Sequence, residues 1–266
     1  MRQQTSKAAG HAQGGARLQI ERILDVTRWA ASRVTRRLPF RRPLTRASYQ
    51  RVWDSVSILE YDAKISVAGI AAEHDLLAAA YLTRDSLLAT VGIHPTDTVL
   101  EIGAGIGRVG SVLAPLCSEW IGGDVSPNML RHLRRRLATL PNVRTVHLNG
   151  YDLDGLETSS VDVIYCTVVF MHLDEWERYT YIRDSYRVLR PGGRLYVDSV
   201  NMLAEHGWAF FQKMVDDYSL TDRPPHISKT STPQELHAYF SRAGFVAIQQ
   251  FTAEHLWLVT HAVKPG

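Results

Sequence analysis

A short apolar strand that runs directly into three alternating glycines constrains the fold of this chain more than any other feature. Residues 99–108 read Val-Leu-Glu-Ile-Gly-Ala-Gly-Ile-Gly-Arg. Glycine tolerates the backbone angles of a tight turn and lets a ligand approach the main chain. The run that follows predicts a helix, whose N-terminus presents unpaired N–H groups and a partial positive charge. The segment therefore predicts a ligand-binding turn between a strand and a helix.

From Thr96 onward, short β-rich runs alternate with amphipathic helical runs. The strands are expected at 98–102, 119–122, 143–148, 161–168 and 194–200, and the intervening helices at about 107–117, 126–139 and 174–189. Such alternation predicts a doubly wound α/β domain with a parallel sheet. Within it, Ser126 and Pro127 are typical of the first residues of a helix, as N-cap and first-turn proline.

The C-terminal part follows a different pattern. Helices are expected at about 201–218 and from Pro233, on either side of a proline-rich loop at 221–233. Two further strands, 245–251 and 256–262, are joined by a short turn. Because a short connection requires antiparallel pairing, the sequence predicts a seven-stranded sheet that is mainly parallel with one antiparallel strand.

Charge divides the chain into two unequal parts. Residues 1–46 hold ten arginines, one lysine and two acids, so this arm carries +9 although the whole chain of 266 residues carries only +3. We expect three segments: a basic, partly disordered arm (1–46), a helical cap (47–95) and a catalytic domain (96–266). Arm residues 17–46 could form an amphipathic helix on an anionic membrane surface, an arginine-rich surface helix, or no stable helix.

Targeting and cysteine signals favour a reducing compartment. No run reaches the ~18 apolar residues of a membrane span, and the start lacks the apolar core of a secretory signal. Cys117 and Cys166 stand among apolar residues without metal-binding spacing, as reduced core thiols would. Arginine outnumbers lysine 25 to 5, which is typical of a GC-rich genome, so we expect a bacterial cytoplasmic protein, at most peripheral at the inner membrane face. The sequence indicates no particular oligomeric state.

A dinucleotide-binding site is the first alternative for the glycine loop. A literal G-x-G-x-x-G stands at Gly105, Gly107 and Gly110. In that fingerprint, however, the first glycine directly follows the strand. Counted from Gly103, the third glycine would fall on Arg108. This register disfavours a nicotinamide or flavin cofactor.

The glycine motif and the segments after it resemble those of the class I S-adenosylmethionine-dependent methyltransferases. The pattern E-x-G-x-G-x-G is similar to the family's first motif, and Asp124 ends the second strand 21 residues after Gly103. Similar segments follow in the family's order at 149–153, 161–165, 189–193 and 243–245. The resemblance covers about residues 96–262 and leaves out the first 95.

The resemblance implies a Rossmann-like domain that binds S-adenosylmethionine. Asp124 would accept hydrogen bonds from both ribose hydroxyls, and Glu101 would orient the ammonium of the methionine tail. The adenine would lie against residues 150–152, where Gly150 stands in place of the family's usual acid. The cofactor-binding residues expected on this basis are Glu101, Gly103, Ala104, Gly105, Asp124, Val125, Met129, Gly150, Tyr151, Asp152 and Thr167.

A hydroxyl acceptor needs a base to take its proton, and histidine is the usual one near neutral pH. His172 follows the fourth strand, where ligands bind in open α/β sheets, and His226 lies in the loop before the last helix. Either could be catalytic; His172 could equally be a structural ring. Asp174 and Asp198 with His172 could hold a divalent cation, but without a compact ligand motif no metal is expected.

The pattern is most similar to that of bacterial O-methyltransferases of sugars, glycolipids and small molecules. We therefore expect methylation of a sugar hydroxyl in a glycan, polysaccharide or glycolipid. The alternatives are an N- or C-methyltransferase of a lipid, quinone or secondary metabolite, and a cofactor-binding protein without catalysis. A nucleic-acid methyltransferase is disfavoured, because the body of the chain is acidic and the amine-methylation motif N/D-P-P-Y is absent.

Overall fold

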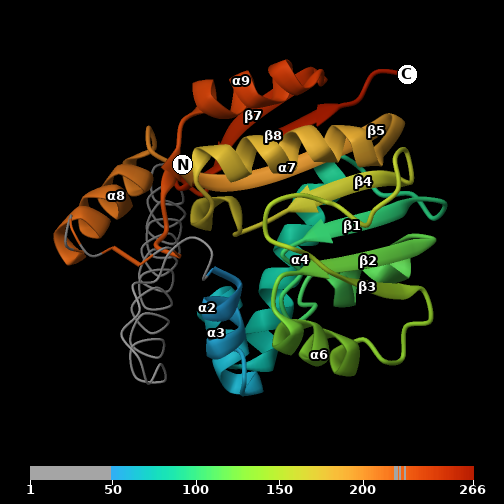
Figure 1. Ribbon diagram of the computed structural model, residues 1–266, viewed down its shortest axis with the longest axis horizontal. Coiled ribbons are helices and arrows are strands. Elements are labelled where there is room, and N and C mark those ends of the chain that lie inside the picture. Colours follow the sequence, from blue (N-terminus) through green and yellow to red (C-terminus); the bar gives the residue numbers. More distant parts are fainter. Residues whose placement is uncertain (1–48, 219–220, 222, 225) are drawn as a thin grey trace, which may run out of the picture.

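The computed structural model describes residues 49–218, 221, 223–224 and 226–266 (Figure 1). The basic arm lies outside these residues. Its helix and its membrane contact therefore stay predictions.

A single mixed sheet forms the centre of the described chain. Its strands are β1 Thr98–Ile102, β2 Glu119–Asp124, β3 Val143–His147, β4 Val161–Cys166, β5 Leu189–Asn201, β6 Thr230–Ser231, β7 Val246–Ala253 and β8 Trp257–Val263. The strand order is β3-β2-β1-β4-β5-β8-β7, with β6 paired beside the end of β5. Only β8 runs antiparallel to its neighbours, β5 and β7. The doubly wound, mainly parallel arrangement with one antiparallel strand is confirmed.

The predicted count of seven strands is wrong, because the sheet has eight. The additional strand, β6, consists of two residues that pair with Val200 and Asn201. It lies in a proline- and serine-rich stretch without the alternation that marks a strand in a sequence. Tertiary pairing with the end of β5, rather than local preference, makes it a strand.

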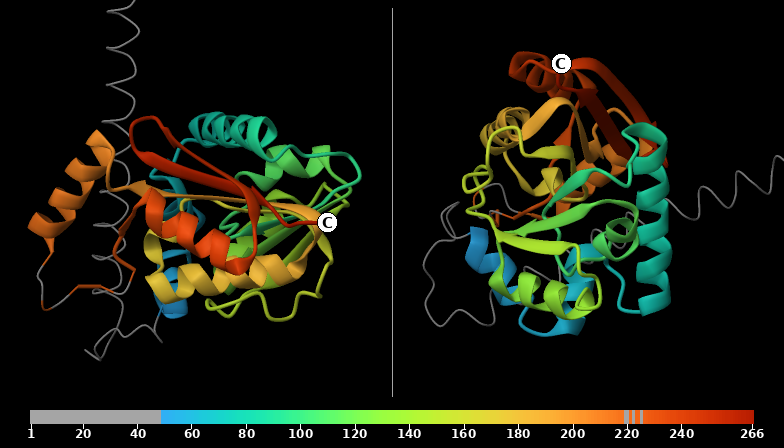
Figure 2. Two further views of the ribbon diagram at one scale, coloured as in Figure 1. Left: turned by 90° about the horizontal axis from the view of Figure 1, so that it is seen from above. Right: turned by 90° about the vertical axis from the view of Figure 1, so that its right-hand side faces the viewer.

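Helices cover both faces of the sheet (Figure 2). Their bounds are α2 Tyr49–Val56, α3 Glu60–Ala68, α4 Glu73–Thr90, α5 Gly110–Leu113, α6 Pro127–Arg136, α7 Glu175–Val188, α8 Glu205–Asp217 and α9 Pro233–Ala243. One core cluster joins the sheet to α7 and α9, and another joins its opposite face to α4, α5 and α6. As predicted, α6 begins at Pro127, and the Ser126 side chain accepts a hydrogen bond from the Met129 N–H as its N-cap.

The helices before β1 are attached to the start of α6. Asp54 accepts hydrogen bonds from the Ser126 hydroxyl (3.0 Å) and the Asn128 N–H (3.1 Å). The ring of His132 bonds to the carbonyl of Ser57 at 2.9 Å. These contacts hold α2 beside the carboxyl end of β2, where the predicted cofactor site lies.

One stretch, Glu60–Thr90, is long and apolar enough to cross a membrane by length and composition alone. It is divided at Gly69, the left-handed residue that ends α3. Residues of both halves line the larger cavity described below. A single stretch of this kind is weak evidence, so we assign no membrane span to it.

Candidate active site

The glycine loop curls back against β2 and leaves no room for side chains. Gly103 and Gly105 have φ values of +75° and +52°. A Cβ on Gly103 would lie 2.3 Å from Cγ2 of Val169, and one on Gly105 would lie 2.7 Å from Cγ1 of Val67. The Gly103 N–H donates to the Gly123 carbonyl at 2.8 Å. Glycine is thus required here by both backbone angle and contact distance.

Gly103→Ala should lower the free energy of unfolding by about 2–4 kcal/mol, since it adds a steric clash to an unfavourable backbone angle. Gly155→Ala is the matched control, because Gly155 also has a positive φ (+88°) but nothing lies within 4 Å of its would-be Cβ. The double variant Gly103→Ala with Val169→Ala should regain the part of the unfolding free energy that the steric clash removes, because the clashing Cγ2 of Val169 is then absent. Denaturant unfolding of these three variants and of the unmodified chain measures the cost of the backbone angle and the cost of the clash. Equal losses for the two glycine variants would contradict the clash.

Asp124, at the end of β2, fastens the glycine loop to the next helix. Its Oδ2 accepts a hydrogen bond from the Gly105 N–H at 2.8 Å, and its Oδ1 accepts one from the Ser126 N–H at 2.9 Å. Burial raises the pKa of Asp124 to about 6, although both N–H groups act in the opposite direction. An ionised carboxylate has about four lone-pair sites, so Asp124 can accept a hydrogen bond from a ligand in addition to those from the backbone.

Glu101 lies behind the loop rather than at a cavity wall. Its Oε2 accepts a hydrogen bond from the Tyr165 hydroxyl at 2.7 Å, and that hydroxyl accepts one from Trp120 Nε1 at 3.0 Å. Burial raises the pKa of Glu101 to about 8, and the nearby charge of Arg108 partly offsets this rise. Glu101 lines neither of the two cavities described below, so it could reach a ligand there only through another group.

A cavity of about 80 Å³ lies over the glycine loop; we call it the smaller cavity. The predicted cofactor residues in its wall are Gly103, Gly105, Asp124, Val125, Met129 and Thr167. Its opposite wall comes from α2 and α3, through Tyr49, Trp53, Ser66 and Val67. The structure therefore brings together most of the motif residues that lie far apart in the sequence.

Five predicted cofactor residues are absent from that wall: Glu101, Ala104, Gly150, Tyr151 and Asp152. The last three follow β3. Residues 150–152 form a turn organised by Asn149, whose Oδ1 accepts hydrogen bonds from the N–H groups of Tyr151 (2.8 Å) and Asp152 (3.1 Å). The Asp152 carboxylate is engaged within the turn by Asn149 Nδ2 at 2.7 Å. Tyr151 is 48% exposed.

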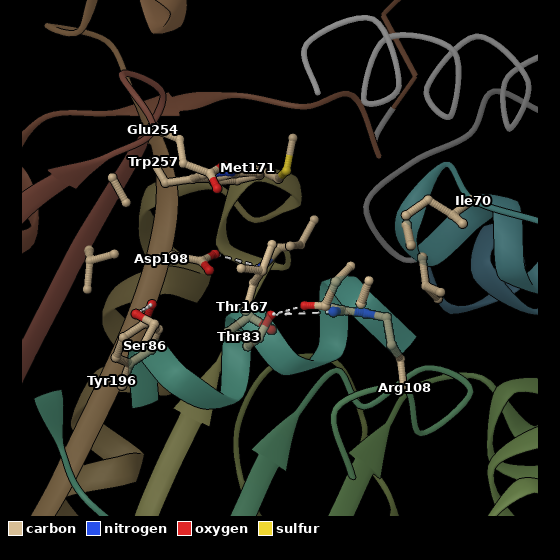
Figure 3. A pocket seen from close by; sticks show the side chains of 18 of the residues that line it. Ile70, Thr83, Ser86, Arg108, Thr167, Met171, Tyr196, Asp198, Glu254 and Trp257 are labelled. Carbon is tan, nitrogen blue, oxygen red and sulfur yellow. Dashed lines mark hydrogen bonds between the residues drawn. The ribbon is translucent and has the colours of Figure 1, made fainter. Parts of the chain in front are cut away.

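A second cavity of about 350 Å³, the larger cavity, adjoins the first over the ends of β4 and β5 (Figure 3). The two share five wall residues: Ser66, Val67, Thr167, Val168 and His172. Much of the larger cavity is apolar, with walls from Ile70, Ala79, Leu82, Met171, Trp257 and Val259. Its polar wall residues include Ser86, Arg108, Tyr196 and Asp198.

Asp198 is the buried acid of the larger cavity. Its Oδ1 accepts a hydrogen bond from the Val168 N–H at 2.7 Å. Burial raises the pKa of Asp198 to about 7. No group of three His, Cys, Asp or Glu side chains suited to a metal ion occurs among the described residues. Asp174, the other acid considered for a metal, is the N-cap of α7.

His172 lies at the junction of the two cavities, whereas His226 lines neither. The Nδ1 of His172 is 2.9 Å from the carbonyl oxygen of His226. A carbonyl only accepts, so Nδ1 carries the proton and Nε2 is the basic nitrogen of the neutral ring. The ring of Trp53 meets the His172 ring edge-on at 4.8 Å between centroids.

The His226 side chain is sealed in the interior. It is 1% exposed, and neither ring nitrogen has a hydrogen-bond partner among the described residues. Burial alone lowers the pKa of His226 to about 4, so its ring is neutral at physiological pH. What His226 contributes to the site is its backbone carbonyl, which orients His172.

Two groups of wall residues were not singled out from the sequence. Trp53 and Val67 belong to the cap, where no motif distinguishes them from core residues. Arg108 could have been noticed, because it directly follows the glycine motif. Its position in the larger cavity depends on the turn between the loop and α5.

Residues 100–197 match the model of a family described as a methyltransferase domain. This part of the chain is therefore similar to a methyltransferase domain. Solved structures support the same fold: the chain aligns with Haemonchus contortus phosphoethanolamine N-methyltransferase 2, solved in complex with S-adenosylmethionine, at a TM-score of 0.55 and 16% identity. That alignment covers 74% of this chain and 53% of the other. S-adenosylmethionine, the predicted cofactor, is the cofactor of enzymes of this kind.

Curated relatives agree on the domain and differ in their acceptors. A probable S-adenosylmethionine-dependent methyltransferase of Mycolicibacterium smegmatis is 34% identical over 105 residues, which are 40% of this chain and 38% of that protein. The malonyl-[acyl-carrier protein] O-methyltransferase of Methylococcus capsulatus is 29% identical over 161 residues, 58% and 54% of the two chains. The chain thus spans about half or less of the length of these relatives.

Proposed function

We propose that this methyltransferase domain binds S-adenosylmethionine across the two cavities, with the adenosine in the smaller one. The glycine cradle of Gly103 and Gly105 suits a ligand that lies against the backbone. Asp124 presents two carboxylate oxygens that only accept hydrogen bonds, which suits the two hydroxyls of a ribose. The smaller cavity is below the ~300–1,000 Å³ of ordinary ligand sites. The cofactor would therefore have to extend into the larger cavity of about 350 Å³.

The junction of the cavities is the observation that carries the proposal. Methyl transfer is an in-line displacement, so the acceptor must meet the methyl carbon within ~3–3.5 Å. A sulfonium placed beside Thr167 and His172 would direct its methyl group into the larger cavity. The larger cavity is therefore the proposed acceptor site.

We propose His172 as the base that accepts the proton of an acceptor hydroxyl. The bond from Nδ1 to the His226 carbonyl sets the tautomer and leaves Nε2 basic. The proton moves from the acceptor oxygen to Nε2 as the oxygen–methyl bond forms and the sulfur–methyl bond breaks. His226 would act only through its carbonyl.

The apolar wall favours an acceptor with an apolar body. Ile70, Leu82, Met171 and Trp257 would cover a lipid, quinone or aromatic metabolite better than a free sugar, which needs a hydrogen-bonding wall. A sugar hydroxyl of a glycolipid also fits, if its apolar part lies on this wall. The acceptors named for the compared proteins, malonyl-[acyl-carrier protein] and phosphoethanolamine, do not include a sugar.

The test is transfer of a labelled methyl group from S-adenosylmethionine into three panels: lipids and quinones, glycolipids, and free sugars. Label in either of the first two panels, with none in the free sugars, supports the acceptor class. Preferential labelling of free sugars would overturn it. Failure of the chain to bind S-adenosylmethionine would overturn the proposed function as a whole.

The basic arm and the peripheral membrane location are a separate proposal, as is the division into arm, cap and catalytic domain. Deletion of residues 1–46 removes a net charge of +9, and we expect it to abolish binding to anionic vesicles. Turnover on a water-soluble acceptor should persist, because every wall residue of the two cavities in the described part of the chain comes after the arm. Vesicle sedimentation measures the first effect, and unchanged sedimentation would contradict the membrane role.

A further inference from the structure

Arg108 enters the larger cavity with most of its donors unused. It follows the glycine loop, and its side chain extends toward Thr83 of α4 and Thr167 (Figure 3). Nη1 donates one long hydrogen bond, 3.4 Å, to Thr83 Oγ1. Among the described residues the guanidinium makes no other hydrogen bond and no ion pair. A guanidinium has five N–H donors, so four are available to a ligand.

Among the described residues, no carboxylate forms a close ion pair with Arg108. Burial lowers the pKa of Arg108, and the charges of Glu101, Tyr165 and Asp198 act against this. Burial also raises the pKa of Glu101 to about 8 and of Asp198 to about 7, so near neutral pH Glu101 is largely uncharged and Asp198 is only partly ionised. Asp75 and Glu254 contribute further acids to the cavity wall, and His172 adds an imidazole. A partly buried cation without a paired anion is costly, and a bound anion would offset that cost.

The chemistry of the proposed cofactor supplies such an anion. A sulfonium bears three carbon substituents: the ribose carbon, the methyl group and the methionine chain. With the ribose at Asp124 and the sulfur at the junction, the methionine chain could extend into the larger cavity, which adjoins the smaller one. Thr167 lies in both cavities, and Arg108 lies in the larger one.

We propose that Arg108 binds the carboxylate of the methionine tail of S-adenosylmethionine. This inference rests on the proposed function. A guanidinium and a carboxylate pair through two parallel hydrogen bonds, for which the planar fork of arginine is suited. Thr83 holds the guanidinium from the side of α4. The tail would thereby occupy the Arg108 end of the cavity and leave the Asp198 and Trp257 end to the acceptor.

Two available ligands allow the contribution of the methionine tail to binding to be measured apart from that of the adenosine. S-adenosylhomocysteine carries the amino-acid tail, and methylthioadenosine has the same adenosine and thioether without it. Arg108→Met should weaken S-adenosylhomocysteine about 10- to 100-fold and change the affinity for methylthioadenosine by less than about twofold. Arg84→Met is the matched control, because Arg84 is a nearby arginine on α4 that pairs with Asp85 outside the cavity. Calorimetry of the three proteins gives the affinities.

Arg108→Lys and a measurement on the unmodified chain cover the case in which Arg108→Met does not fold. The lysine variant should lose less affinity for S-adenosylhomocysteine, since it keeps the charge without the fork. In the unmodified chain, the NMR signal of Arg108 Nε should shift with S-adenosylhomocysteine and stay in place with methylthioadenosine.

The outcomes distinguish this inference from the proposed function. Equal weakening of both ligands would overturn it, because Arg108 would then act on the adenosine site or the fold. Unchanged affinity for both would also overturn it, and the guanidinium would then be available to an acidic acceptor. If the unmodified chain binds neither ligand, the proposed function itself fails.

Discussion

His172→Ala is expected to lower the rate of methyl transfer by about 10²–10⁴-fold, the usual contribution of a general base. The ring lies where the two cavities meet, and the His226 carbonyl holds it in the tautomer with a basic Nε2. Because His172 also lines the smaller cavity, cofactor affinity must be measured separately. Turnover at saturating S-adenosylmethionine then reports the proton transfer alone.

His172→Asn distinguishes a catalytic role of the ring from a structural one better than His172→Ala does. An asparagine amide can still donate to the His226 carbonyl, so the loop should stay intact while the basic nitrogen is lost. We expect the rate loss to persist and the melting temperature to stay near that of the unmodified chain. His255→Ala is the control, a histidine outside both cavities. If His172→Asn keeps the full rate at every pH, the ring is structural and the base lies elsewhere.

Much of the fold could be predicted because, in most elements, the local sequence pattern favours the same structure that tertiary packing requires. The strand into the glycine loop and the Ser126–Pro127 helix start are each determined by residues a few positions apart. The strand β6 was missed because its two residues have no strand pattern and pair only through the end of β5. A pairing between strands that are far apart in the sequence leaves no local pattern from which it could be predicted.

The site could be predicted only where a motif marks it. Asp124 and Gly103 stand at fixed places after strands, so their position at the carboxyl edge of the sheet follows from topology. Trp53 and Val67 reach the same cavity because α2 and α3 fold over that edge, and contacts such as Asp54 to Ser126 fix this. Those contacts join residues 72 positions apart.

Asp124→Ala is expected to weaken S-adenosylmethionine binding by about 100-fold or more. Each hydrogen bond to an ionised carboxylate is worth about 1.5–3 kcal/mol, and Asp124 would offer one to each ribose hydroxyl. The variant also releases the N–H groups of Gly105 and Ser126, so its unfolding must be checked alongside calorimetry. Asp154→Ala, at an exposed acid, should change neither quantity. Unchanged affinity in Asp124→Ala would remove the ribose role.

The pH dependence of cofactor affinity distinguishes an Asp124 carboxylate that binds the ribose from one that only stabilises the fold. Burial raises the pKa of Asp124 from 3.8 to about 6, so between those two values the folded chain holds a proton that the unfolded chain does not. As the pH falls through that window, Asp124 should increase the stability of the ligand-free chain, because only the folded state binds the extra proton. Cofactor affinity should decrease over the same window, because a protonated carboxyl is a poorer acceptor for two hydroxyls. Asp124→Asn should abolish both trends, and an affinity that stays flat between pH 7 and pH 5 in the unmodified chain would contradict the ionised carboxylate as the ribose ligand.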